Sequence, residues 1–266
     1  MIILVGNPSP DRKLIVFLLD DKHRIAAVLK VGLTPGGRLS VLREAEALRK
    51  LERYGWAPNI RTVLPDLGAA AQEYVDGTLP NLRFRPDYLE LLCRLPQSDD
   101  SLKLSDAAGA MENRLRPWAD EVHKIVPDLL KRCLSCVELD TAIPTMLVHG
   151  DFVPWNIRKT PKSGYVLVDW EWSDFAGLPA YDLLHFHFSE DLLFGGRIGG
   201  YAALRTSQVC AEYLKRMNLD PQLLPRLAIL YLLDRLESHY KYLDSVAGEY
   251  LLRQLGAVLD SLSFAS

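Results

Sequence analysis

One short stretch of the chain carries side chains that could act together on a phosphate group. In LVHGDFVPWNIR, residues 147–158, His149, Asp151 and Asn156 follow an apolar run, and Asp169 ends a second apolar run, YVLVD. Magnesium prefers oxygen ligands and usually takes only one or two from protein, so an Asn carbonyl and an Asp carboxylate suit it. A further carboxylate nearby can accept the proton of an attacking hydroxyl. The pattern therefore predicts a magnesium site at Asn156 and Asp169, with Asp151 as the general base.

The same residue types also have a purely structural interpretation. Asp and Asn are common in loops, where their side chains hydrogen-bond to nearby backbone groups. The motif H-G-D-x-x-x-x-N alone therefore does not decide between chemistry and loop structure. Its pairing with a strand-terminal aspartate, Asp169, favours chemistry, because that residue supplies a second oxygen ligand.

A pair of opposite charges is predicted in the first third of the chain. Lys30 lies within AAVLKVG, a predicted strand, and Glu44 lies in the helix predicted next. A buried lysine needs a partner, because an unpaired charge inside a protein is very costly. An ion pair of Lys30 with Glu44 would hold the ammonium group towards the phosphates of a nucleotide. The alternative is that Lys30 ends an edge strand in solvent and Glu44 lies on an exposed helix face.

Hydrophobic periodicity and turn residues predict the elements that position these side chains. The first third is mostly β, with one amphipathic helix at residues 38–55 that ends at Gly55. The predicted strands are residues 1–6, 13–20, 23–32, 59–67 and 69–75.

The character of the chain changes at Asp76-Gly77. From residue 82 onwards the sequence is mostly helical, apart from the β-like runs TMLVHGD and GYVLVDW between Leu147 and Asp169. Long amphipathic helices are predicted at residues 201–217, 221–243 and 249–262. The prediction is an α+β fold of two lobes: a small β-rich lobe, residues 1–76, and a larger, mainly helical lobe, residues 77–266, with a hinge near Glu73 to Gly77.

Composition excludes several classes of protein. The 266 residues are 48% hydrophobic and 24% charged, as in a soluble globular protein with a full core. The net charge of -3 gives no reason to expect nucleic acid, which requires a basic surface. No signal peptide is recognised, and Arg226 and Asp234 interrupt the most apolar run, so no membrane span is predicted. We expect a cytoplasmic protein, and its oligomeric state stays open.

The cysteines give little indication of a metal or redox site. Cys133 and Cys136 form a C-x-x-C pair, but no second pair or well-spaced histidine couple completes a zinc site. Their surroundings are helical in pattern, which favours two buried or half-buried thiols.

Taken along the chain, these segments resemble the aminoglycoside phosphotransferase and choline kinase group of small-molecule kinases, which share the bilobal protein-kinase-like fold. The similar segments are VLKVG, LREAEALRKL, AQEYVDG, HGDFVPWN, LVDWEW and PAYDLLHF, which cover most of the chain. The H-G-D-x-x-x-x-N loop followed by a strand that ends in D-W-E is specific to this group.

The resemblance implies an ATP-dependent phosphotransferase that moves the γ-phosphoryl group of Mg-ATP to a hydroxyl of a small molecule. Asp151 would orient or deprotonate that hydroxyl. Asn156 and Asp169 would bind the magnesium ion that bridges the phosphates. Lys30, anchored by Glu44, would contact the α- and β-phosphates.

The resemblance also implies supporting roles. The backbone of Glu73 and Val75, in the segment between the lobes, would meet the edge of the adenine. His149 would shape the catalytic loop, and Asp182 would brace that loop through backbone hydrogen bonds. The turn GNPSPDRK, which would cover the phosphates, contains only Gly6 and departs from a G-x-G-x-x-G pattern.

The acceptor stays open among aminoglycosides, sugars and amino alcohols. Carboxylates would suit a cationic acceptor, and the acidic candidates are Glu171, Asp174, Glu190, Asp191, Asp234 and Glu237. Aromatic faces attract quaternary ammonium groups and stack on sugars, although aromatic residues are more often core. The aromatic candidates are Trp155, Trp170, Trp172, Phe175, Tyr181, Phe186 and Phe188.

Two other functions compete with a small-molecule kinase. A nucleotide-binding pseudokinase with a regulatory role is the main alternative, although the intact set of Lys30, Asp151, Asn156 and Asp169 disfavours it. A protein kinase is disfavoured because the loop reads His-Gly-Asp, not His-Arg-Asp, and Trp-Glu follows Asp169 where Phe-Gly is expected.

Overall fold

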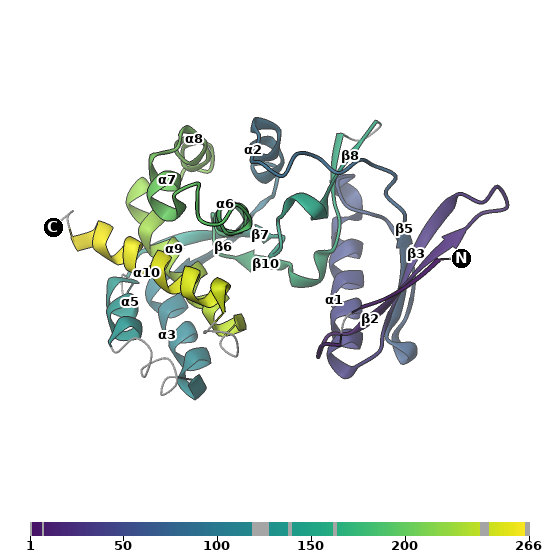
Figure 1. The fold of residues 1–266 in the computed structure, drawn as a ribbon, viewed down its shortest axis with the longest axis horizontal. Helices are drawn as coiled ribbons and strands as arrows, with labels where there is room; N and C mark the ends of the chain where they lie inside the picture. The colour runs from purple at the N-terminus through teal and green to yellow at the C-terminus, as the bar shows by residue number, and fades with distance from the viewer. Residues whose placement is uncertain are drawn as a thin grey trace. The chain divides into compact units, whose positions relative to one another are not determined.

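The computed structural model describes residues 2–6, 8–118, 128–137, 140–161, 164–239 and 245–263. The chain divides into two compact units (Figure 1). The first unit contains Met1–Leu82 and His149–Ser173, and the second contains Arg83–Val148 and Asp174–Ser266. The lobe boundary predicted after residue 76 stays a prediction.

A five-stranded antiparallel sheet forms most of the first unit, in the order β1-β2-β3-β5-β4. All five predicted strands are present: β1 (Ile2–Val5), β2 (Lys13–Leu19), β3 (Ile25–Gly32), β4 (Ile60–Leu64) and β5 (Ala69–Glu73). A short 3-10 turn, η2 (Pro65–Leu67), joins the last two. Because β3 is the central strand, Lys30 is not on an edge strand.

Helix α1 (Pro35–Leu51) packs on this sheet. It begins earlier than predicted, because Thr34 caps it by accepting a hydrogen bond from the Gly37 amide at 3.1 Å and Pro35 occupies the first turn. Its apolar face, including Val41, packs against Ala70 of β5. The turn η1 (Glu52–Tyr54) follows the helix.

The segment His149–Ser173 returns to the first unit from far along the chain. It contains the hairpin β8 (Ile157–Thr160) and β9 (Gly164–Leu167) with the turns η4 (Pro154–Asn156) and η5 (Trp170–Trp172). Thr78 pairs with Lys159, and the Leu167 amide donates to the Trp56 carbonyl at 2.9 Å. These backbone contacts hold the predicted catalytic segment against the strand-rich part of the unit.

The second unit is mainly helical. Its helices and 3-10 turns are α2 (Pro86–Leu92), α3 (Leu104–Leu115), η3 (Arg116–Trp118), α5 (Leu129–Val137), α6 (Tyr181–Leu193), α7 (Gly200–Thr206), α8 (Gln208–Arg216), η6 (Pro221–Leu223), α9 (Leu224–His239) and α10 (Val246–Ser263). Helix α9 is its central element, since Ala228, Ile229 and Leu230 are fully buried there. In the described part of the chain, no helix is both long and apolar enough for a membrane span.

The second unit also contains a sheet that the sequence predicted only in part. Its order is β10 (Asp174–Gly177), β7 (Ala142–Val148) and β6 (Gln97–Lys103). The expectation of helix outside residues 147–169 was wrong for β6 and β10, because QSDDSLK has no apolar alternation and DFAG is too short for a pattern.

One predicted helix, residues 201–217, is in fact two helices. Ser207 adopts an extended conformation between α7 and α8, and its hydroxyl accepts a hydrogen bond from the Cys210 amide at 3.1 Å. Serine is a strong N-cap, so it begins a new helix inside an otherwise periodic pattern. Residues 240–243 of the helix predicted at 221–243 lie outside the described residues.

Candidate active site

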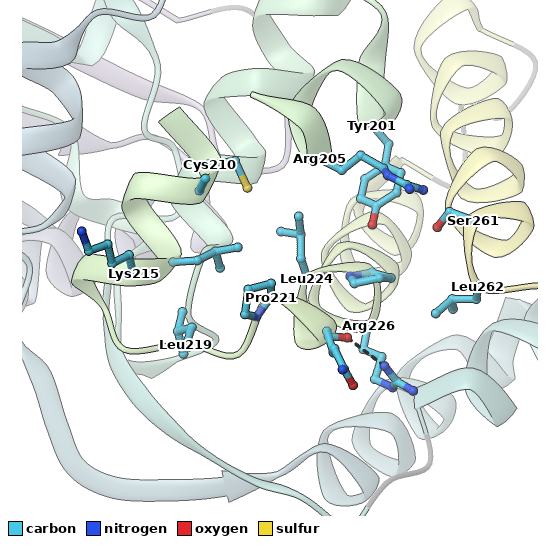
Figure 2. A pocket seen from close by; sticks show the side chains of 14 residues that line it. Tyr201, Arg205, Cys210, Lys215, Leu219, Pro221, Leu224, Arg226, Ser261 and Leu262 are labelled. Atoms are coloured by element: carbon cyan, nitrogen blue, oxygen red, sulfur yellow. Dashed lines mark hydrogen bonds between the residues drawn. The ribbon is translucent and has the colours of Figure 1, made fainter. Parts of the chain in front are cut away.

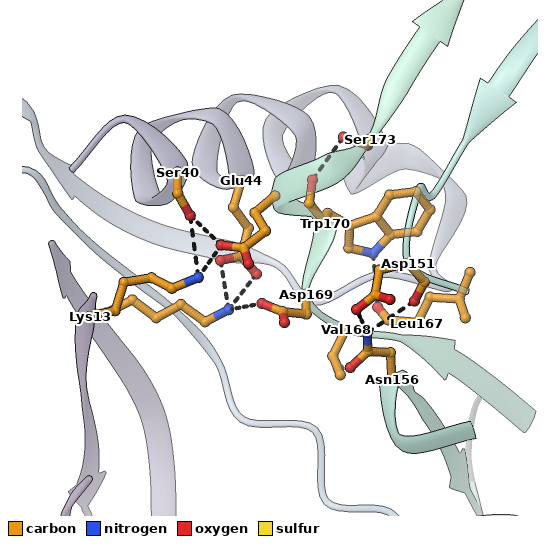
Figure 3. A network of polar contacts seen from close by, with 12 residues as sticks. Lys13, Ser40, Glu44, Asp151, Asn156, Leu167, Val168, Asp169, Trp170 and Ser173 are labelled. Atoms are coloured by element: carbon orange, nitrogen blue, oxygen red, sulfur yellow. Dashed lines mark hydrogen bonds and ion pairs between the residues drawn. The ribbon is translucent and has the colours of Figure 1, made fainter. Parts of the chain in front are cut away.

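Lys30 is the centre of a buried ion-pair network in the first unit (Figure 3). Its ammonium group donates to both carboxylate oxygens of Glu44, at 2.8 and 2.6 Å, and to Asp169 Oδ1 at 2.7 Å. Lys30 is 7% exposed and Glu44 2%. The structure therefore brings the two residues together as predicted, and adds Asp169 as a second partner.

The partners of Lys30 keep its charge in place despite burial. Burial alone would lower the pKa of Lys30, but Glu44 and Asp169 raise it above the usual value. Burial would likewise raise the pKa of Asp169, and the nearby Lys30 outweighs it, so the pKa of that carboxyl is lowered. Both groups are therefore charged at neutral pH, as phosphate and metal binding require.

Asp151 and Asn156 contact each other across the loop that joins them. The side-chain amide of Asn156 donates to the Asp151 carbonyl oxygen at 3.0 Å and to its carboxylate oxygen Oδ2 at 2.8 Å (Figure 3). These contacts fix the orientation of the amide, and its oxygen Oδ1 accordingly faces away from Asp151. The loop sequence therefore places the amide nitrogen of Asn156 beside the Asp151 carboxylate, with the amide oxygen on the other side.

His149 and Gly150 determine the shape of this loop. His149 is fully buried, and its Nδ1 accepts from the Asp151 amide at 3.3 Å, which leaves Nε2 to donate to the Val168 carbonyl at 3.1 Å. Gly150 has φ of 81°, and a Cβ there would lie 2.2 Å from the Trp172 carbonyl oxygen. Both residues thus join the loop to the segment that carries Asp169, and the loop-shaping role of His149 stays a prediction.

Asp169 has a backbone conformation that is unusual for a side chain of its kind. Its φ is 71° and its ψ is 60°, in the left-handed region. Such a conformation is strained for most residues other than glycine and is tolerated best by Asn and Asp. It turns the chain sharply between β9 and η5, and the carboxylate is thereby directed to Lys30.

Asn156 and Asp169 offer oxygens of the kind that magnesium requires. In the described contacts, the side chain of Asn156 uses only its nitrogen Nδ2, and the side chain of Asp169 uses only Oδ1. The Asp169 side chain is 34% exposed. Among the described residues, no group of three or more His, Cys, Asp or Glu side chains could hold a metal. Two protein oxygens nevertheless fit magnesium, which completes its coordination with water and phosphate.

A second lysine network lies beside the first, and the sequence did not predict it. Lys13 forms an ion pair with Glu171, and its ammonium group also donates to Ser40 Oγ at 3.2 Å. The hydroxyl of Ser40 donates to Glu171 in turn. The only sequence signal is the spacing from Ser40 to Glu44, which places both on one face of α1.

The segment predicted to contact the nucleotide base begins at Glu73, the last residue of β5. The Glu73 amide donates to the Asn59 carbonyl at 2.8 Å, and the Glu73 side chain accepts from Asn59 Nδ2 at 3.0 Å. Val75 is half-buried beyond the strand, and no described backbone hydrogen bond uses its amide. Val75 therefore retains a backbone donor, whereas the amide of Glu73 is already engaged.

The candidates for a cationic acceptor are mostly occupied by other groups. Glu171 is paired with Lys13, and Asp191 accepts from the Tyr250 hydroxyl at 2.8 Å. Arg114 pairs with Asp234 at 2.7 Å and with Glu237 at 2.8 Å. The other two, Glu190 and Asp174, contact Arg83 Nη1 at 3.6 Å and the Ala176 amide at 2.9 Å. The described acidic side chains therefore do not form an unpaired anionic cluster.

The aromatic candidates differ in burial, and two of them, Phe175 and Tyr181, are half-buried. Trp170, Phe186 and Phe188 are at most 2% exposed, which is ordinary core packing. Trp155 and Trp172 are 46% and 57% exposed, and they adjoin Asn156 and Glu171 in sequence. Asp182 is buried in the first turn of α6, in the second unit, and its bracing role stays a prediction.

A pocket of about 720 Å³ lies within the second unit, between α7, α8, α9 and α10 (Figure 2). Its lining includes Arg205, Lys215 and Arg226 and no acidic residue of the described chain. None of the residues predicted for catalysis lines it. The pocket is therefore unsuited to a cationic acceptor.

The cysteine pair lies in a helix of the second unit. Cys133 is buried and Cys136 half-buried in α5, as predicted. Burial raises the pKa of Cys133 to about 12, so its thiol stays protonated at neutral pH.

The model of the family described as Phosphotransferase enzyme family matches residues 13–213. Choline kinase LicA from Streptococcus pneumoniae has a similar structure, with a TM-score of 0.58 and 16% identity, over 97% of this chain and 94% of LicA. The streptomycin–ATP complex of APH(2")-IIa has a TM-score of 0.60 and 15% identity, over 97% of this chain and 93% of that one.

A third similar structure is the macrolide 2'-phosphotransferase MphH from Brachybacterium faecium. Its TM-score is 0.54 and its identity 18%, over 94% of this chain and 91% of MphH. No curated protein matches the chain in sequence. Identities this low show the fold alone, and they confirm the predicted α+β, protein-kinase-like class.

Proposed function

Because this chain belongs to the phosphotransferase enzyme family, we propose that it is a small-molecule kinase that transfers the γ-phosphoryl group of Mg-ATP to an acceptor hydroxyl. Membership of the family confirms the predicted resemblance and the prediction of a phosphotransferase enzyme. Family membership does not identify the nucleotide, the metal or the acceptor, so these three are what we propose.

The observation that carries the proposal is the arrangement of Lys30 with Glu44 and Asp169. A central strand, a helix and the segment after β9 each supply one of these charges. Burying such a network is costly, and a hydrophobic set of similar volume would stabilise the fold at least as well. A site that must bind a polyphosphate and a cation accounts for that cost, since it needs both signs of charge in one place.

Each residue has a distinct task in this function. Lys30 binds phosphate oxygens while Glu44 holds its ammonium group. Asn156 and Asp169 bind magnesium, which when present neutralises the charge on the phosphates. Asp151 accepts the proton of the acceptor hydroxyl or orients it, and the amide of Asn156 fixes the carboxylate for this.

The nucleotide is proposed to be ATP. The ATP complex of the structurally similar APH(2")-IIa supports this choice. The carbonyl of Glu73 and the amide of Val75 would accept from and donate to the adenine edge, because the amide of Glu73 is engaged with Asn59. Backbone contacts of this kind do not depend on the side chains at these positions, so the sequence says little about which base is bound.

The acceptor is proposed to be a small molecule that is neutral or carries a single positive charge. Each acidic candidate already has a cationic or hydrogen-bonding partner, so a polycationic acceptor would have to displace several of them. Trp155 and Trp172 are exposed beside the catalytic residues and offer ring faces to a sugar or an ammonium group. A sugar or amino alcohol therefore fits better than an aminoglycoside with many ammonium groups.

The test is phosphorylation of pooled acceptors. The protein is incubated with Mg-ATP and separate pools of aminoglycosides, sugars and amino alcohols, and mass spectrometry detects any acceptor that gains one phosphoryl group. The expected result is phosphorylation in the sugar or amino alcohol pool, abolished by EDTA. A protein that binds Mg-ATP but phosphorylates no acceptor in any pool would instead favour the pseudokinase alternative.

A further inference from the structure

Lys13 lies on the same face of the sheet as Lys30. In the antiparallel register, Lys13 is opposite Gly32 and Ile15 is opposite Lys30. Opposed residues point to the same face and side chains alternate along a strand, so the side chains of Lys13, Ile15 and Lys30 share one face. A Cβ on Gly32 would lie 2.2 Å from the Arg38 amide of α1, which shows that this is the face covered by the helix.

The two lysines are held in parallel ways. Each contacts one side chain of α1, Ser40 for Lys13 and Glu44 for Lys30, and these are one helical turn apart. Each also contacts one carboxylate of the segment after β9, Glu171 for the first lysine and Asp169 for the second. The same two elements, α1 and the segment after β9, therefore hold both lysines.

The lysines differ in the donors that they retain. The contacts of Lys30 with Glu44 and Asp169 account for all three hydrogens of its ammonium group. The described contacts of Lys13 use two, with Glu171 and Ser40, and its side chain is 16% exposed. Lys13 therefore has a hydrogen to donate without breaking any contact, whereas Lys30 must release one.

The ammonium group of Lys13 is also near the predicted metal ligand. It pairs with Glu171, two residues after Asp169, and side chains of α1 one helical turn apart hold the two lysines. A cation this close to Asp169 would lie next to any phosphate that shares a metal with that carboxylate. The turn between β1 and β2, which has only Gly6, ends at Lys13 itself.

We propose that Lys13 is a second phosphate-binding lysine, which contacts the β- or γ-phosphate of the bound nucleotide while Glu171 and Ser40 hold its ammonium group in position. This inference rests on the proposed nucleotide site. Lys13 would supply a positive charge for phosphate binding next to the turn between β1 and β2, which lacks the G-x-G-x-x-G pattern.

The test compares nucleotides with different numbers of phosphates. Calorimetry measures the affinity of Lys13→Met and wild type for ATP, ADP and AMP in the presence of magnesium. We expect the affinity for ATP to fall by about tenfold or more, and that for ADP to fall as well if the contact is to the β-phosphate, while that for AMP stays within about twofold. Lys13→Arg, which keeps the charge, should recover part of the loss.

Lys22→Met is the matched control, because Lys22 lies exposed in the turn between β2 and β3. It should bind all three nucleotides as the wild type does. Equal loss of affinity for ATP, ADP and AMP in Lys13→Met would overturn the proposal, because the Lys13–Glu171 pair would then have only a structural role. Unchanged affinity for ATP would overturn it as well. Failure of the wild type to bind Mg-ATP would contradict the proposed function itself.

A second measurement uses wild-type protein, so it does not depend on whether Lys13→Met folds. Wild-type protein is acetylated with a limiting amount of an amine-reactive reagent, and mass spectrometry measures the rate at which each lysine is modified. Mg-ATP should slow modification of Lys13 several-fold relative to adenosine, and leave that of Lys22 unchanged. Equal modification of Lys13 in ATP and adenosine, with ATP bound, would contradict the contact.

Discussion

At the scale of single residues, Lys30 and Lys13 show what a sequence reveals about a charged group. Lys30 lies inside an apolar strand, where a charge needs a partner, and its pairing with Glu44 could be predicted on that ground. Lys13 follows a turn, where lysine is ordinarily in solvent, and its contact with Glu171 depends on strand register and on a segment distant in sequence. Burial of a charge leaves a local signal, whereas long-range contacts do not.

Asp169→Asn tests the metal site at this scale. The change removes a negative ligand and one charged partner of Lys30, so magnesium should no longer strengthen nucleotide binding. Calorimetry with ATP, with and without magnesium, measures the effect. Asp66→Asn, at an exposed position of η2, is the control and should behave as wild type. A magnesium dependence that persists in Asp169→Asn would remove this residue from the metal site.

At the scale of elements, periodicity predicted the strands of the first unit and most helices, and failed where polar residues form structure. The strand β6, QSDDSLK, is stabilised by pairing with β7 and not by an apolar face. Ser207 divides a periodic helix in two, because a capping side chain competes with the helix continuing. Both failures arise where hydrogen bonds, and not buried apolar surface, decide the local structure.

Helix α1 connects the turn between β1 and β2 to the ion pairs, and its first turn is sensitive to substitution. The Thr34 hydroxyl caps the helix at the Gly37 amide and also donates to the Pro10 carbonyl in the turn. Thr34→Ala should lower the free energy of unfolding by about 1 kcal/mol. Thr34→Ser retains the hydroxyl and should lose much less. Urea denaturation of the three proteins measures this, and equal losses in both variants would show that the cap does not stabilise the helix.

At the scale of the whole molecule, the resemblance indicated the fold class, but the residues of each unit followed from long-range contacts. The return of His149–Ser173 to the first unit depends on the bridge between Thr78 and Lys159 and on the bond of Leu167 to Trp56. These are backbone contacts between segments about eighty or more residues apart, and backbone groups are the same in every sequence. The motif proposed to be catalytic could therefore be recognised in the sequence, whereas its placement against the strands could not be predicted.

Acid should destabilise the second unit through His187. Burial lowers the pKa of this side chain, although its contact with the Gly200 carbonyl, at 2.7 Å, and the charge of Asp191 partly oppose this effect. The unfolded chain then binds a proton near pH 6.5 that the folded chain does not, so stability falls as the pH drops below about 6.5. The loss is at most about 1.4 kcal/mol per pH unit.

Melting temperatures between pH 7.5 and 5.5 test the role of His187. The wild type should melt at lower temperature as the pH falls, and His187→Gln, which can still donate to Gly200, should show a weaker dependence. His23→Gln is a control at an exposed position and should follow the wild type. If His187→Gln and wild type have the same pH dependence, another group is responsible.

The most direct test of the central claim is the rate of ADP release by wild type and Asp151→Asn, with Mg-ATP and an acceptor that the wild type phosphorylates. The variant keeps the contact partner of Asn156 but loses the proton acceptor. We predict that it binds Mg-ATP as the wild type does, while turnover falls by about 10²- to 10⁴-fold. Near-normal turnover in Asp151→Asn would contradict the assignment of this loop as the catalytic centre.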